Sequence, residues 1–142
     1  MIPTLNPETI AILKELGINV ERARRALFVR RTADKIISAA HSYFADAVNV
    51  ESSGRRSNRL EARKRHATWR AMAMAGMGSS EIAAKFNMNH TSVIHGIART
   101  ECDEGLRMQA RDILELAGMS NLAQQPKKSD AANVSVREEN AA

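Results

Sequence analysis

Four short polar side chains stand in a row at residues 89–92, reading Asn-His-Thr-Ser. Each of them can donate or accept hydrogen bonds, as contacts with base edges require. Val93, Ile94 and Ile97 follow at helical spacing and are expected to face inward, which turns the polar row outward at a helix start. The free backbone N–H groups of a helix start also favour a phosphate. Because Asn, Thr and Ser prefer helix starts for local reasons, the row alone leaves a structural role open.

A dense group of positive charges precedes this row, between residues 54 and 70. Residues 22–70 carry 13 Lys and Arg against four Asp and Glu, a local net charge of +9. Residues 101–142 carry five Lys and Arg against eight Asp and Glu, a local net charge of −3. Such a positive field attracts a polyanion, and arginine suits both phosphates and base edges. On charge alone, an acidic membrane surface or a merely solvated surface fits as well. The seven cations of this arginine-rich segment are Arg55, Arg56, Arg59, Arg63, Lys64, Arg65 and Arg70.

Other chemistry finds little support in the residue types present. His90 and His95 are five residues apart and fall on different helix faces, so no metal site is expected. The single cysteine, Cys102, has no catalytic partner pattern, and it fits a reducing cytoplasm. The chain has no G-x-x-x-x-G-K-[ST] phosphate loop. We therefore expect neither enzymatic activity nor a cofactor, and no nucleotide binding.

The elements that must position these residues are helices, because helical spacing recurs and strict alternation never persists. The two short helices Ser79–Phe86 and His90–Thr100, joined by a three-residue turn, have the spacing of a helix-turn-helix. The sequence thus predicts an all-α protein, a helical bundle containing a helix-turn-helix. The other expected helices are 7–16, a second from about Asn19, one from a Thr32 cap to Ala47, 60–75 with Trp69 in the core, and 106–117.

The chain is expected to divide into three parts. Residues 1–31 are interpreted as an N-terminal helical extension, and 32–118 as the DNA-binding domain. Residues 119–142 are polar and are predicted to be a disordered C-terminal tail. No apolar run is long enough to span a bilayer, and the N-terminus lacks the pattern of a signal peptide. No membrane association is expected, and the expected location is the cytoplasm of a bacterial or phage-infected cell.

Three stretches in the right order resemble the C-terminal DNA-binding domain of the bacterial replication initiator DnaA. Residues 81–96 are similar to that family's Glu-Ile-Gly, spacer, Phe-Gly-Gly-Arg-Asp-His-Thr-Thr-Val-Leu-His-Ala signature. Tyr43-Phe44, nine residues and then Gly-Arg-Arg-Ser at 54–57 resemble its Tyr-Tyr, nine residues, Lys-Arg-Arg-Ser. Residues 62–66, Ala-Arg-Lys-Arg-His, lie where the family has Ala-Arg-Pro-Arg-Gln. The resemblance covers residues 33–118 and implies a stand-alone, Trp-repressor-like helix-turn-helix without the ATPase domain.

Carried over residue by residue, the resemblance implies two kinds of contact with double-stranded DNA. His90 and Thr91 match the pair that reads bases in the major groove, and Asn89 takes the place of the acidic base-reader. Arg56, with Arg55 beside it, matches the arginine that enters the minor groove. The expected phosphate contacts are Ser92, Arg63, Lys64 and Arg65.

The sequence also departs from the family, chiefly in the turn. The turn is one residue shorter, with Asn87 where the family has Gly-Gly, while Met88 replaces the signature Arg and Asn89 the Asp. Asn58 replaces an arginine of the minor-groove loop. The expected function is sequence-specific DNA binding in replication initiation or its regulation, at a box that differs from the family's. The alternatives are a transcriptional regulator of phage or mobile-element origin, and a basic protein that docks an acidic partner.

Overall fold

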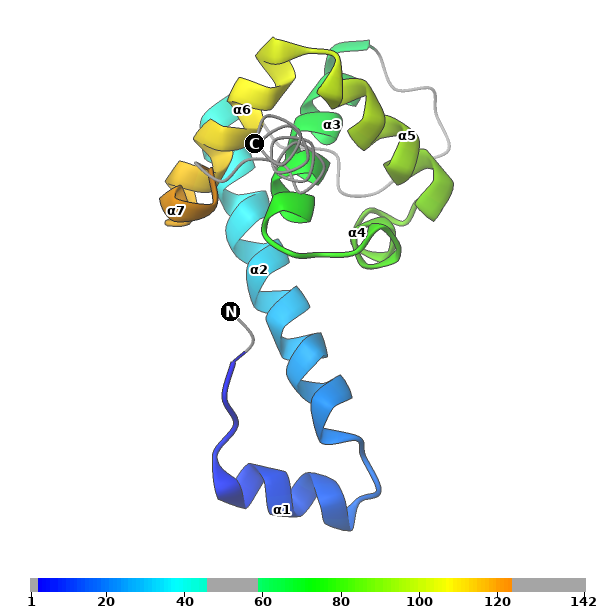
Figure 1. Ribbon diagram of the computed structural model, residues 1–142, viewed down its shortest axis with the longest axis vertical. Helices are drawn as coiled ribbons and strands as arrows, with labels where there is room; N and C mark the ends of the chain where they lie inside the picture. Colours follow the sequence, from blue (N-terminus) through cyan, green and yellow to red (C-terminus); the bar gives the residue numbers. More distant parts are fainter. Residues whose placement is uncertain (1–2, 46–58, 124–142) are drawn as a thin grey trace, which may run out of the picture.

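The computed structural model describes residues 3–45 and 59–123, and within those ranges it contains helices and no strand, as predicted (Figure 1). No helix in these ranges is long and apolar enough to cross a bilayer. The seven helices are α1 (Pro7–Glu15), α2 (Val20–Phe44), α3 (Arg59–Met74), α4 (Ser79–Phe86), α5 (His90–Glu101), α6 (Glu104–Leu116) and α7 (Ser120–Ala123).

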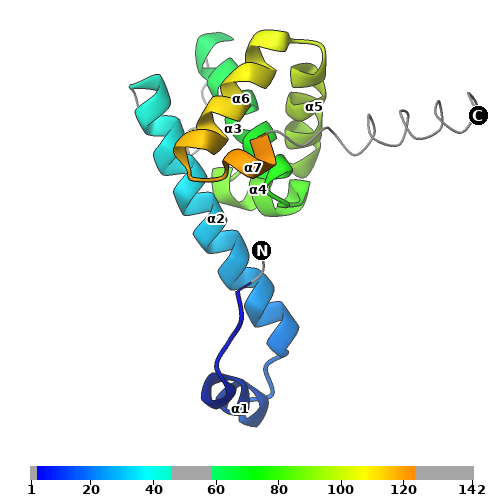
Figure 2. The same cartoon turned by 60° about the vertical axis from the view of Figure 1, so that its left-hand side comes forward.

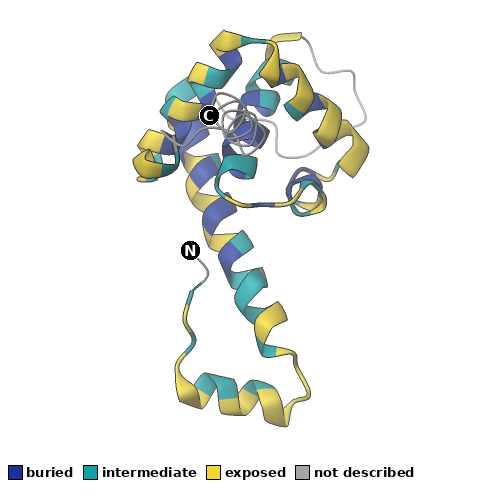
Figure 3. Ribbon diagram, in the orientation of Figure 1, coloured by how far each residue is buried: buried dark blue, intermediate teal, exposed yellow. Residues whose placement is uncertain are grey.

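Helix α1 and the first part of α2 form an arm that extends from the rest of the molecule, while the second part of α2 packs against α3 and α6. Figures 1 and 2 both show α1 at the end of α2 that lies away from the rest of the molecule. Both helix starts follow the sequence prediction, since Asn6 Oδ1 accepts a hydrogen bond from Thr9 N at 2.7 Å and Asn19 Oδ1 accepts one from Arg22 N at 3.2 Å. Gly17, with φ of 73°, turns the chain between them. Helix α1 buries no residue, as Figure 3 shows.

The prediction that a helix starts at Thr32 is wrong, because α2 runs unbroken from Val20 to Phe44. Thr32 is buried inside this helix and lies next to the core residue Ala33. The physical reason is that no glycine or proline interrupts residues 20–44, so nothing stops the helix that Asn19 starts. The expected boundary between residues 31 and 32 therefore falls within a single helix.

Helix α3 forms the centre of the core, packing against α2, α4, α5 and α6. Both Trp69 and Met72 of α3 are fully buried. The Trp69 ring meets the Phe86 ring of α4 edge to face, with ring centroids 5.7 Å apart. Ile36 of α2 and Ile113 of α6 complete this core. The prediction of Trp69 as a core residue is confirmed.

The helical part of the chain extends further than the sequence predicted. Residues 119–142 were expected to be unpacked, yet α7 follows α6, and Met119 and Leu122 pack against the core. Met119 and Leu122 are three residues apart and so lie on one face of this short helical turn, which lets both contact the core. Residues 124–142, the rest of the expected tail, lie outside the described residues.

Candidate nucleic-acid interface

Helices α4 and α5 form the predicted helix-turn-helix, with the turn at residues 87–89 (Figure 1). Asn87 takes the left-handed conformation, with φ of 50°, and Met88 N donates to Ala83 O at 2.9 Å. This pattern closes α4 in the way that glycine usually does, and asparagine is the other residue that tolerates it. Ile82 and Phe86 of α4 are buried, so α4 is fixed to the core beside α5.

The predicted base-reading residues lie at the start of α5. His90, Thr91 and Ser92 are all exposed. Asn89 caps the helix, because its Oδ1 accepts a hydrogen bond from Thr91 N at 2.9 Å. A bidentate contact with adenine needs both the oxygen and the nitrogen of an asparagine side chain, and the cap already engages the oxygen. His90 and Thr91 are therefore better placed to read bases than Asn89.

The prediction that Ile94 faces inward is wrong, because 49% of its surface is exposed. Val93 is buried and Ile97 packs against the core, as predicted, and the other buried positions of α5 are Gly96 and Thr100. A Cβ atom at Gly96 would lie 2.6 Å from Trp69 Cζ3, so the backbone of α5 rests directly on the Trp69 ring. This close seat turns Gly96 toward the core and Ile94 away from it.

The arginine-rich segment divides in the structure, and only part of it stays at the surface. Arg65 and Arg70 are buried, with 8% and 7% of their surfaces exposed. Arg70 Nη1 donates to Thr100 Oγ1 at 3.2 Å, so this arginine links α3 to α5. Burial lowers the pKa of Arg65 below its usual range, while the charge of Glu61 raises it. The expected phosphate contact at Arg65 therefore has little surface to offer.

Arg63 and Lys64 keep more of their surface than Arg65. Arg63 Nη1 forms an ion pair with Asp103 Oδ2 at 2.8 Å, and the arginine side chain is 41% exposed. Asp103 also caps α6, so this pair joins the start of α3 to the corner between α5 and α6. The Lys64 ammonium lies 5.7 Å from the centre of the Phe44 ring. Because a guanidinium has five N–H donors, its bond to Asp103 leaves donors of Arg63 for a phosphate.

The side chain of His66 lies close to positive charges of both α3 and α5. Its ring packs on Trp69, with ring centroids 5.4 Å apart. Burial lowers the pKa of His66, and the charges of Arg99, Arg65 and Arg63 lower it further. Arg99 belongs to α5 and is exposed, so the positive field of α3 continues onto the helix-turn-helix. Sequence reasoning missed Arg99, although its place seven residues after Ser92 puts both on one flank of α5.

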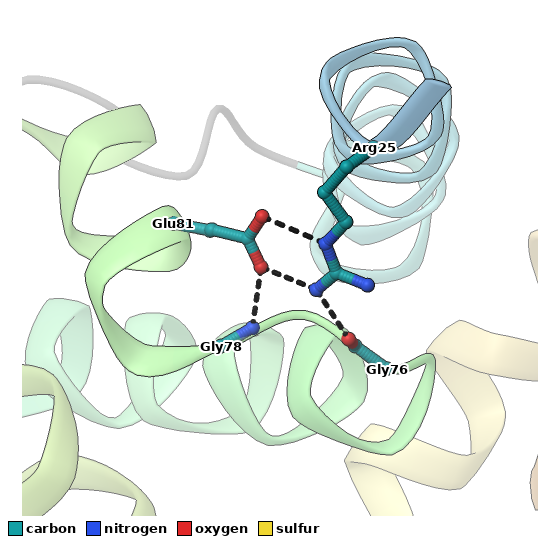
Figure 4. A network of polar contacts seen from close by, with 4 residues as sticks. All are labelled: Arg25, Gly76, Gly78 and Glu81. Atoms are coloured by element: carbon teal, nitrogen blue, oxygen red, sulfur yellow. Dashed lines mark hydrogen bonds and ion pairs between the residues drawn. The ribbon is translucent and has the colours of Figure 1, made fainter. Parts of the chain in front are cut away.

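An ion pair between Arg25 of α2 and Glu81 of α4 connects the helix-turn-helix to α2 (Figure 4). Arg25 Nε donates to Glu81 Oε2 at 2.9 Å, and Arg25 Nη2 bonds both Glu81 Oε1 and Gly76 O. Gly78 N donates to the same Glu81 oxygen at 2.9 Å. The hydrogen bond from Arg25 lowers the pKa of Glu81, as does that from Gly78, although burial opposes both. Arg25 therefore has its partner within the chain, the carboxylate of Glu81.

Arg55 and Arg56, expected in the minor groove, lie outside the described residues, as does Asn58. In residues 3–45 and 59–123, no three His, Cys, Asp or Glu side chains are grouped to hold a metal ion.

Comparison of the chain with protein-family models, curated proteins and solved structures found no match.

Proposed function

We propose that this protein binds double-stranded DNA in a sequence-specific manner, with α5 as its recognition helix, and acts as a binding protein, not an enzyme. The observation that carries the proposal is the exposed start of α5, where His90 and Thr91 stand free of the core. The fixed seat of α5 on Trp69 supports it further, because base reading requires a rigidly placed helix.

The charges beside α5 supply the second half of the proposal. Phosphate contacts fix the position of a protein on the duplex, and base contacts choose the sequence. Arg99 and Ser92 on one flank of α5, together with Arg63 and Lys64 on α3, are the proposed phosphate contacts. Thr91 and His90 are the proposed base contacts. The proposed role is replication initiation or its regulation, in the bacterial cytoplasm, on the strength of the resemblance to the initiator domain, with transcriptional regulation as the alternative.

A salt titration of binding to labelled duplexes tests this division of labour. Each phosphate contact that is lost should lower the slope of log K against log salt by about one unit. We expect Arg63→Ala and Arg99→Ala to lower the slope in this way for every duplex. Lys14→Ala removes the same charge from α1, at the far end of the arm, and is expected to leave the slope unchanged (Figure 1).

Thr91→Ala provides the complementary measurement. It removes a base contact without removing charge, so the salt slope should stay and the preference between duplexes should shrink by about 1–3 kcal/mol. A protein that docks an acidic partner through its charge would show a salt slope with no preference between duplexes. That result, or unchanged binding in both arginine variants, would refute the proposed interface.

A further inference from the structure

The surface of α5 that faces away from the core is a regular stripe. Its members follow the spacing i, i+3, i+4, i+7, which places them on one face of the helix. The core side of α5 has the same spacing two residues further on, with Val93, Gly96 and Thr100 buried and Ile97 packed against the core. All four members of this outward stripe are exposed: Thr91, Ile94, His95 and Ala98.

Ile94 lies in the middle of the outward stripe, and 49% of its surface is exposed. An isolated exposed isoleucine is common on protein surfaces and by itself indicates nothing. Here, however, it lies between Thr91 and His95 on the face proposed to enter the major groove. Packing in the core does not explain an isoleucine at this position, because Val93 and Gly96 are the residues of this turn that contact the core.

The major groove offers one apolar group to such a side chain, the C5-methyl of thymine. Three residues of α-helix advance by about 4.5 Å, and successive nucleotides of a strand are about 3.4 Å apart along the axis. With α5 lying along the groove, Ile94 would therefore reach a base about one step from the base that Thr91 reads. Ala98, the next member of the stripe, is small, so it allows the duplex to come close to α5.

We infer that Ile94 is a specificity-determining residue that contacts a thymine C5-methyl, next to the base pair that Thr91 reads. The inference rests on the proposed function, because it needs α5 to lie in the major groove. It adds to that function an apolar contact that selects thymine. It also predicts which atom of the DNA is recognised, and that atom can be removed without disturbing the pairing.

The test uses the full-length protein and a duplex obtained by selection from a random library. Each thymine in the selected site is replaced by uracil in turn, which removes the methyl and keeps the O4 acceptor. For the wild-type protein, one replacement should weaken binding about fourfold, equivalent to about 0.8 kcal/mol for one buried carbon group. Ile94→Ala should bind the thymine duplex more weakly and lose this sensitivity at that position, whereas Ile94→Val should keep most of it.

Met108→Ala is the matched control, since Met108 is an apolar side chain with 56% of its surface exposed and lies on α6. It should retain both the affinity and the response to uracil. The inference fails if Ile94→Ala keeps the wild-type response at every position, or if no uracil replacement matters to the wild type. If the wild type selects no preferred sequence at all, the proposed function fails, and the role of Ile94 fails with it.

Discussion

Replacing Gly96 with alanine perturbs the contact that sets the pose of α5. An added Cβ atom would lie 2.6 Å from Trp69 Cζ3 and 2.7 Å from both Trp69 Cε3 and His66 Cδ2. Carbon atoms in good contact are about 3.5–4.0 Å apart, so the overlap is about 1 Å. Trp69 is 1% exposed and its ring lies edge to face with Phe86, which leaves the indole little room to withdraw.

Two opposing effects decide the size of the change. Overpacking a filled core costs about 1–3 kcal/mol. Alanine is favoured over glycine within a helix by about 0.8–1.0 kcal/mol, which offsets part of that cost. We therefore expect Gly96→Ala to lower the free energy of unfolding by about 1 kcal/mol. Because α5 must shift outward to admit the methyl group, we also expect the folded variant to bind DNA more weakly.

Urea unfolding followed by tryptophan fluorescence measures this effect, since Trp69 is the only tryptophan in the chain. Gly105→Ala is the control, because a Cβ atom there would meet Asp103 Oδ1 at 3.2 Å and no core atom nearer than that. We expect the control to be neutral, or more stable by up to about 1 kcal/mol. If Gly96→Ala is as stable as the control, the result contradicts the close packing of Gly96 against the Trp69 ring.

Two further predictions concern the groups that hold the helix-turn-helix in place. Arg25→Gln and Glu81→Gln should each lower the free energy of unfolding by about 0.5–1 kcal/mol, because the Arg25 side chain is partly solvent-exposed and such pairs are weak. In the double mutant the losses should not add, and full additivity in a double-mutant cycle would argue against the contact. For His66 the lowered pKa means that the unfolded chain takes up a proton first as the pH falls. Its contribution to stability is therefore complete above the unfolded pKa of about 6.5 and is lost as the pH falls below that value. Thermal unfolding at pH 7.5 and 5.5 should show a smaller drop in Tm for His66→Gln than for the wild type, and an equal drop would contradict this origin.

Helix boundaries could be predicted from the sequence wherever a local cap or stop sets them. Asn6, Asn19 and Asn89 each cap a helix that begins where the sequence predicted, and Gly118 follows the end of α6. Such signals act within one turn, so they can be read from neighbouring residues. The Thr32 prediction failed because a threonine resembles a cap in sequence, whereas no glycine or proline ends the helix that Asn19 starts, so α2 continues through Thr32.

Val93 and Ile97 of α5 face the core as predicted, but the burial of Gly96 and Thr100 could not be predicted, because glycine and threonine carry no hydrophobic signal. Counting apolar residues favoured Ile94 as an inward residue over Gly96 and Thr100. What decides the matter is the fit of Gly96 against Trp69, a contact across 27 residues of sequence. Hydrophobic pattern alone gives no access to a close approach of this kind.

The division of the arginine-rich segment was hidden for a similar reason. Charge spacing along α3 does not show that Arg65 and Arg70 are buried while Arg63 stays at the surface. Thr100, the partner of Arg70, and Asp103, the partner of Arg63, lie at least 30 residues away in the sequence. Composition indicates how much positive charge the segment has, and the fold decides which charges remain available to a ligand.

Selection of bound duplexes from a random library tests sequence-specific binding through α5 most directly. We predict that the wild-type protein enriches one motif over successive rounds. Thr91→Ala, selected in parallel, should enrich a weaker motif or one changed at a single base pair, because it loses one base contact and keeps its charge. A wild-type pool that stays random while binding remains salt-dependent would contradict the account, since charge alone would then explain the attraction to DNA.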